Sequence, residues 1–194
     1  MRTRRWGIVP AILLMGGTVL GATVPAAAAP GTSAGTTAYA TACPTGWGSL
    51  PKSASTAAYD DPLTDIRSGT HECYDRLVFD VPGGGTSVGH QVQYVNQLIQ
   101  DGSGNTIPVS GGAILEIRLS APSYDPNTGT STYPGVTGQP LQGIDLTGYP
   151  TFRDTRFGSS FEGVTQVGLG VRARLPFRVL QLSDRVVVDV AHTW

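Results

Sequence analysis

The chain has 194 residues, a formal charge of −1 and only 14% charged residues, and a chain of this length is expected to form one domain. No basic patch is visible, which makes nucleic acid and anionic membrane surfaces poor candidate partners. The 26 glycines and 14 prolines divide the apolar residues into short runs, and this composition predicts an all-β fold.

Residues 1–29 have the pattern of a secretory signal peptide. Three arginines precede a mostly apolar run over residues 6–24, and Ala27–Ala29 provides the small side chains that signal peptidase reads. The alternative is an uncleaved membrane anchor, although a proline and four glycines make the run a weak span. We expect cleavage, which leaves ten basic and fourteen acidic side chains and no stable membrane span. Residues 30–42, rich in Gly, Ser, Thr and Ala, then predict a flexible linker ahead of one folded domain over residues 43–194.

Cys43 and Cys73 are the only cysteines of the chain. An even pair in an exported protein predicts a disulfide, worth about 3 kcal/mol in the chain-entropy model. A metal site at His71 and Cys73 is the alternative, but one His and one Cys fall far short of a zinc ligand set. We therefore predict no metal and no cofactor.

The folded part shows the apolar alternation that is typical of β-strands. In residues 113–120, Leu115 and Ile117 point to one face while Glu116 and Arg118 point to the other. We expect strands over six segments, the last two joined as a hairpin: residues 74–81, 88–95, 113–120, 164–172, 177–182 and 185–190. Short strands separated by turns predict a two-sheet β-sandwich.

Two glycine-bearing segments allow more than one interpretation. Residues 101–105 have oxygen side chains at alternate positions, but Thr106 stands where a calcium loop needs glycine, so a tight turn between strands is favoured. Gly168 and Gly170 leave bare backbone on one face of a strand, which allows a ligand or another chain segment to approach closely. Tight packing within the protein is the favoured interpretation of this second feature.

Residues 121–161 lack a clear strand pattern and predict a long irregular loop. Short strands, or a helical turn near residues 143–147, are an alternative within it. Such loops tend to be functional or mobile. Aromatic side chains are common in ligand sites, so we interpret Tyr124, Tyr133 and Tyr149 as candidate binding residues.

One seven-residue pattern occurs twice, at residues 75–81 and again 109 positions later at residues 184–190. Five of the seven positions are identical, and the third, fifth and seventh positions are apolar in both copies. We expect these apolar positions to be buried and interpret the copies as related strands, one in each of two packed sheets. Chance similarity is the alternative, since a repeat is normally recognised over more than two copies.

Arg76 and Arg185 occupy the second position of the two copies and are further candidate binding residues. They can form ion pairs with Asp80 and Asp189, or hold the carboxylates of cell-wall stem peptides through bidentate hydrogen bonds. Local ion pairing is the favoured role.

The sequence contains none of the common catalytic motifs, and we assign no catalytic residue. A surface or hydrogen-bonded role is the favoured interpretation of Asp75 and Asp80, which point to opposite faces of one strand. An enzyme would need ionisable side chains gathered in one cleft. His90, Glu116 and an aspartate within hydrogen-bond reach would favour that alternative.

Four segments of the chain resemble a known family: residues 74–80, 114–119, 161–171 and 176–190. Together they are similar to the AMIN-like domain of exported actinobacterial proteins, over about residues 65–191. The closing strand also resembles that of true AMIN domains, β-sandwiches that hold cell-wall amidases and secretion pores at peptidoglycan. The resemblance implies the same fold and an envelope location, implies peptidoglycan binding only weakly, and brings no catalytic residue.

We therefore expect a secreted, cell-wall-associated module without catalytic activity that binds peptidoglycan or an envelope protein. The alternatives are a hydrolase that acts on wall polymer and a passive structural or secretion accessory.

Overall fold

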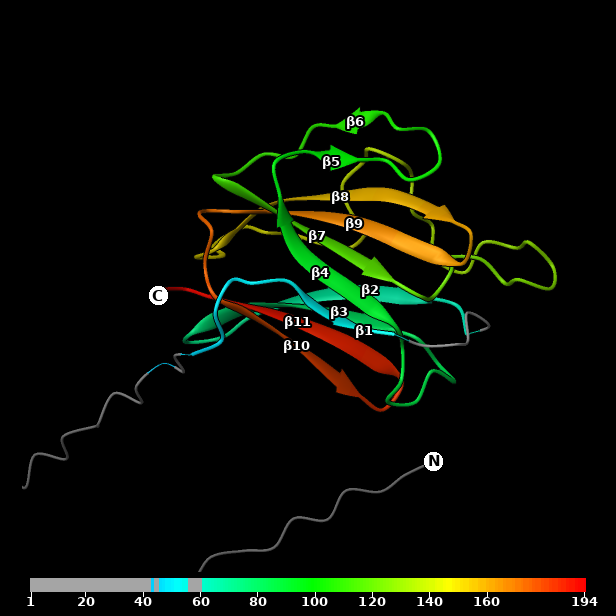
Figure 1. Cartoon of the computed structure of the whole chain (residues 1–194), viewed down its shortest axis with the longest axis horizontal. Helices are drawn as coiled ribbons and strands as arrows, with labels where there is room; N and C mark the ends of the chain where they lie inside the picture. The colour runs from blue at the N-terminus through cyan, green and yellow to red at the C-terminus, as the bar shows by residue number, and fades with distance from the viewer. Residues whose placement is uncertain (1–42, 44–45, 56–60) are drawn as a thin grey trace, which may run out of the picture. The chain divides into compact units, whose positions relative to one another are not determined.

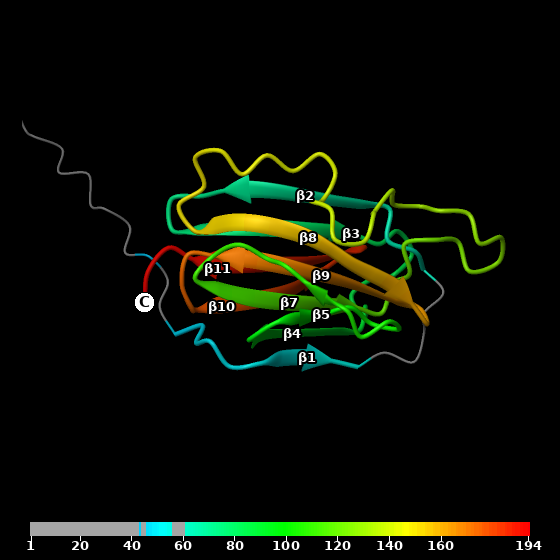
Figure 2. The same cartoon turned by 90° about the horizontal axis from the view of Figure 1, so that it is seen from above.

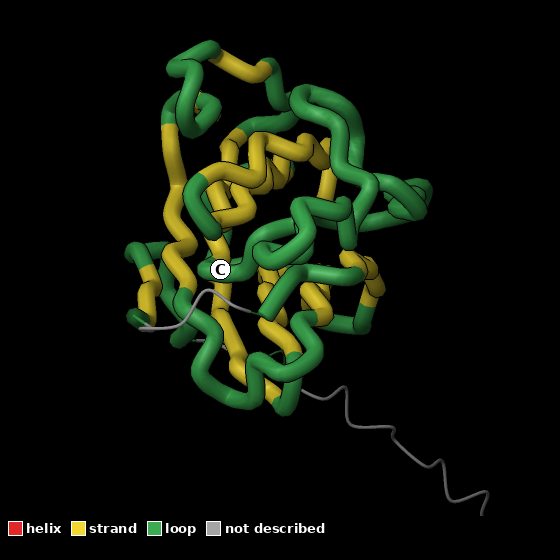
Figure 3. Tube along the Cα trace, turned by 90° about the vertical axis from the view of Figure 1, so that its right-hand side faces the viewer, coloured by secondary structure: helices red, strands yellow, loops and turns green. Residues whose placement is uncertain are grey.

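The computed structural model describes residue 43, residues 46–55 and residues 61–194. Within these residues the chain forms strands, turns and loops without a helix, as Figure 3 shows. The described part of the chain accordingly holds no helix that is long and apolar enough to cross a membrane. The predicted signal peptide and linker, residues 1–29 and 30–42, lie outside the described residues.

The strands form two large antiparallel sheets and one small hairpin (Figure 1). The first sheet contains, in spatial order, β1 (Lys52–Ala54), β4 (His90–Val95), β7 (Ala113–Leu119), β9 (Val164–Val171) and β8 (Phe152–Phe161). The second contains β10 (Phe177–Leu182), β11 (Arg185–Ala191), β3 (Tyr74–Asp80) and β2 (Asp65–Thr70). The hairpin consists of β5 (Leu98–Ile99) and β6 (Thr106–Ile107). The all-β sandwich predicted from the sequence is confirmed.

The hydrophobic core lies between the two large sheets, which Figure 2 shows from above. Leu77 and Phe79 of β3 and Val186 and Val188 of β11 are 0% exposed. Burying an aliphatic or aromatic side chain of this size contributes about 1.5–3 kcal/mol. The same buried cluster includes side chains from the facing sheet, among them Val92, Leu115, Ile117, Val167 and Leu169. The inward faces predicted for both seven-residue copies are confirmed.

The prediction that the two copies lie in different sheets is wrong, because β3 and β11 are neighbours in one sheet. They pair antiparallel, with Arg76 opposite Asp189 and Arg185 opposite Asp80. Each arginine thereby faces an aspartate of the other copy, and opposite charges across a strand pair stabilise the pairing. Two strands in separate sheets could not make these pairs.

The irregular loop predicted over residues 121–161 is shorter than expected, because its last ten residues form β8. β8 pairs with β9 through two register shifts, between Phe152 and Asp154 and between Phe157 and Ser159. Each shift resets the in-and-out alternation, so the strand does not show a period of two in the sequence. Before β8 the segment contains turns and an isolated bridge, without a regular strand.

The bare backbone at Gly168 and Gly170 is covered by the protein itself. An added Cβ at Gly168 would lie 2.5 Å from a methyl carbon of Leu98, and one at Gly170 would overlap the carbonyl oxygen of Ser110. The segment that carries the β5–β6 hairpin therefore packs directly on β9, which confirms the favoured interpretation of tight packing. Residues 101–105 form the turn between β5 and β6, also as predicted.

We predict that Gly170→Ala destabilises the domain by about 1–3 kcal/mol, because the new methyl group has no room beside Ser110. Urea unfolding measures the difference. Gly69→Ala on β2 is the matched control, since a Cβ there meets no atom within 4 Å and should change stability by about 0.5 kcal/mol or less. Wild-type stability for Gly170→Ala would contradict the tight packing of the hairpin segment on β9.

Candidate binding surface

The outer face of the four-stranded sheet carries a shallow hollow of about 270 Å³. All four strands contribute to its lining, which consists of Arg67, Ser68, Gly69, Arg76, Val78, Leu182, Arg185 and Val187. Val78 and Val187 lie opposite each other at the centre of the sheet and form an apolar floor. The hollow thus brings together the two arginines that the repeated pattern identified, Arg76 and Arg185.

Arg76 is committed to an ion pair within the sheet. Its Nε and a terminal nitrogen donate to the two carboxylate oxygens of Asp189 at 2.6 and 2.9 Å. The hydrogen bond to Asp189 raises the pKa of Arg76 above its ordinary value. Asp189 is 0% exposed and also accepts a hydrogen bond from Arg178 at 2.8 Å, so two cations stabilise one buried carboxylate. The favoured prediction of local ion pairing is confirmed for Arg76.

Arg185 also forms the predicted local ion pair, with Asp80, but at a longer distance. Its Nε lies 3.7 Å from the nearest carboxylate oxygen of Asp80, beyond hydrogen-bond distance. Asp80 is already occupied, because Arg67 donates to both of its oxygens at 2.7 and 2.9 Å. Arg185 donates no hydrogen bond to any described residue, and its side chain is 45% exposed. Its planar group of donors is thus available for a carboxylate on a ligand.

Aromatic side chains form the rim of this face. The guanidinium of Arg178 lies 4.3 Å from the ring centre of Trp47 and 5.2 Å from that of Tyr74, distances typical of cation–π contacts. Tyr74 also stacks on His71 with ring centres 4.5 Å apart. No motif in the sequence marks Trp47 or Tyr74 as part of a surface. The predicted disulfide could have indicated their proximity, because it brings Trp47 close to Tyr74 at the start of β3.

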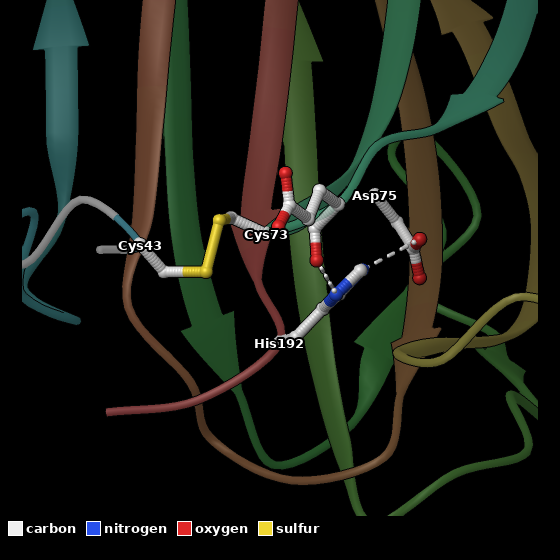
Figure 4. Close-up of a disulfide and its surroundings, with 5 residues drawn as sticks. Cys43, Cys73, Asp75 and His192 are labelled. Carbon is white, nitrogen blue, oxygen red and sulfur yellow. Dashed lines mark hydrogen bonds and ion pairs between the residues drawn. A yellow bond between two sulfur atoms is a disulfide. The ribbon is translucent and has the colours of Figure 1, made fainter. Parts of the chain in front are cut away.

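The disulfide between Cys43 and Cys73 is present, as predicted (Figure 4). A polar contact between Asp75 and His192 lies beside it. Asp75 is 0% exposed, and one of its oxygens accepts hydrogen bonds from the backbone amides of Thr151 and Phe152 at 2.7 and 3.1 Å. Its other oxygen lies 3.0 Å from Nε2 of His192. Asp75 therefore joins β3 to the start of β8 and to the segment after β11, so the two sheets are connected at this end.

The three tyrosines predicted as binding residues do not form one surface. Tyr133 is only 3% exposed, packs against Phe157 and accepts a hydrogen bond from the amide of Gln142 at 3.2 Å, so its assignment as a binding residue is wrong. Burial raises the pKa of Tyr133. The physical reason is that the irregular segment folds back over the sandwich, where a large aromatic side chain gains more from filling the core than from facing solvent.

Tyr149 and Tyr124 are half-buried, and they contact different residues. Tyr149 stacks on Phe152 with ring centres 5.7 Å apart, and its hydroxyl donates to Ser68, which lines the hollow. Tyr124 forms an isolated bridge with Ser131 and does not line the hollow.

The residues named for a catalytic alternative do not converge. His90 shares the inward side of β4 with Val92, whereas Glu116 points to the outer side of β7 between Leu115 and Ile117. Glu116 accepts hydrogen bonds from two glutamine side chains, Gln93 at 3.2 Å and Gln166 at 2.7 Å. Within the described residues, no group of three or more His, Cys, Asp or Glu side chains has the geometry of a metal site.

These observations define a disulfide-bonded β-sandwich domain with a hollow on one sheet face that combines arginine side chains with an apolar floor. A family model described as the AMIN-like domain matches residues 61–192, and the chain belongs to this family. That membership suggests a module related to the cell wall. Neither the curated proteins nor the solved structures contain a match to the chain.

We predict that Asp75→Ala destabilises the domain by about 3 kcal/mol, because two buried backbone amides and His192 lose their acceptor. Urea unfolding at neutral pH measures the loss. Asp65→Ala, at a carboxylate that is 55% exposed, is the control and should have little effect. Similar stabilities for the two variants would mean that Asp75 does not connect the sheets.

We also predict an acid-sensitive component of stability from His90, whose pKa is lowered below 6.5 chiefly by burial. The folded state disfavours the charged imidazole, so its contribution is complete above about pH 6.5 and is lost as the pH falls through the lower folded-state pKa. The urea midpoint should therefore fall less between pH 7.5 and pH 5 in His90→Gln than in the wild type. His71→Gln, at an exposed histidine, should behave like the wild type, and identical pH profiles for all three proteins would refute the assignment.

Proposed function

We propose that the chain is an exported, non-catalytic cell-envelope module that binds peptidoglycan through the outer face of its four-stranded sheet. The observation that carries the proposal is Arg185, which lines the hollow with the apolar floor of Val78 and Val187 and donates no hydrogen bond to a described residue, its only partner being the long ion pair with Asp80. Stem peptides of the wall carry carboxylates on short, extended backbones. A guanidinium next to an apolar strip provides bidentate recognition of such a carboxylate together with contact to the peptide body.

The charges of this face support an anionic ligand. Its strands present four arginines, Arg67, Arg76, Arg178 and Arg185, and three aspartates, Asp65, Asp80 and Asp189. The face therefore has an excess of one positive charge on a chain whose formal charge is −1. Arg76 and Arg178 share the single carboxylate of Asp189, so the excess lies at that group, whereas Arg67 and Arg185 are balanced by Asp65 and Asp80.

Two further observations support an envelope location. Disulfides persist in oxidising compartments, and this domain has one between its only two cysteines. Membership of the AMIN-like family agrees with a wall-related role. The separation of His90 from Glu116 on opposite faces of the first sheet gives no support to the hydrolase alternative.

We predict that the exported protein is retained on purified, protease-treated sacculi and that Arg185→Ala lowers its affinity about tenfold, the loss expected for one charge-assisted hydrogen-bond pair. Arg118→Ala is the matched control, since Arg118 is a half-exposed arginine on the other sheet. Co-sedimentation over a range of salt concentrations measures the affinity.

Each outcome of this experiment has a separate meaning. Absence of retention at every salt concentration would exclude wall binding and leave a passive accessory role. Retention only on untreated sacculi would identify an envelope protein as the partner. Equal losses for Arg185→Ala and Arg118→Ala would remove the outer sheet face as the site.

A further inference from the structure

A second cavity lies on the other sheet, at the end where β4 finishes and β7 begins. Its volume is about 380 Å³, within the range of small-molecule sites. Its walls come from three separate parts of the chain: Tyr94, Val95 and Asn96 at the end of β4, Val109, Gly111, Gly112, Ala113 and Ile114 around the start of β7, and Arg174 between β9 and β10. The proposed peptidoglycan surface shares none of these residues.

Arg174 has no carboxylate partner among the described residues. Six other arginines lie within 4 Å of an aspartate oxygen: Arg67, Arg76, Arg118, Arg156, Arg178 and Arg185. Within the described residues, its only hydrogen bonds go to the hydroxyl and carbonyl oxygens of Ser49, at 3.4 and 3.3 Å. These long contacts leave most of the hydrogen-bonding capacity of the guanidinium unused.

The structure nevertheless holds this cation in place. Its guanidinium lies 5.1 Å from the ring centre of Tyr94, a cation–π distance. The Tyr94 hydroxyl is fixed in turn by Leu175, since it donates to the carbonyl at 2.8 Å and accepts from the amide at 3.0 Å. Leu175 is 3% exposed, so the residue next to Arg174 is anchored in the core.

The rest of the cavity adds no negative charge. No aspartate or glutamate lines it, and burial raises the pKa of Tyr94, so the phenol stays neutral at physiological pH. Val95, Val109 and Ile114 provide apolar contact area beside the guanidinium. Gly112 packs tightly on the backbone of Arg172, which a Cβ would overlap, so backbone forms this part of the lining.

We propose that this cavity binds a carboxylate-bearing ligand of about monosaccharide size, such as a uronic acid or the acidic end of a wall sugar. The carboxylate would pair with Arg174, and the body of the ligand would lie against Val95, Val109 and Ile114. The size and mixed lining of the cavity favour an organic acid over a bare inorganic anion, because phosphate would pair with the guanidinium but leave Val95, Val109 and Ile114 uncovered. This proposal does not depend on the peptidoglycan surface.

Titration of the ¹⁵N-labelled protein with sodium glucuronate, followed by amide chemical shifts, tests the proposal. Glucose is the neutral matched probe, and inorganic phosphate is the probe for a bare anion. We expect glucuronate to shift the amides of Gly111 and Gly112 in a saturable way, and Arg174→Gln to weaken its binding at least about tenfold. Arg153→Gln is the control, since Arg153 is another exposed arginine that pairs with no described carboxylate but does not line the cavity.

Arg174 is exposed and makes only long hydrogen bonds, so Arg174→Gln should keep the wild-type melting temperature. Equal shifts with glucose and glucuronate would overturn the proposal. So would glucuronate binding that survives Arg174→Gln, or the absence of any shift at Gly111 and Gly112. Phosphate binding as tight as that of glucuronate would overturn the assigned ligand class.

Discussion

The antiparallel pairing of β3 with β11 is the interaction on which the rest of the domain depends. On the inner side it sets Leu77 opposite Val188 and Phe79 opposite Val186, and all four side chains are completely buried. On the outer side each arginine of one copy faces an aspartate of the other. A one-residue slip of either strand would turn its apolar side chains toward solvent, so burial and charge specify the same register.

The flanking strands make two nearly equivalent positions chemically different. β10 attaches to β11 and brings Arg178 to Asp189, which becomes a buried carboxylate between two cations. β2 attaches to β3 and brings Arg67 to Asp80, which is thereby fully engaged. As a result Arg76 belongs to the structure of the sheet, whereas Arg185 remains available for a ligand. The repeat is symmetric in sequence, but its two arginines have different roles because their outer neighbours differ.

Much of the fold could be predicted from local patterns, and the failures have physical causes. The strands with an unbroken period of two were found to within two residues, because one side of each faces the core. β8 could not be predicted as a strand because two bulges interrupt its alternation. β2 could not be predicted because it is a short, polar edge strand with a single buried apolar residue, Ile66. The prediction for Tyr133 is wrong because distance from a strand pattern along the chain does not mean distance from the core.

The sequence by itself determined the all-β class, the disulfide, the inward faces of the main strands and the matching positions of Arg76 and Arg185 in the two copies. These features depend on alternation, cysteine count and repetition, which are visible along the chain. Only the tertiary structure decided which sheet each copy joins, which arginine keeps its donors free, and that Arg174 faces a cavity without a carboxylate. The reason is that ion pairing and cavity shape depend on strands that are distant in the chain and become neighbours only on folding.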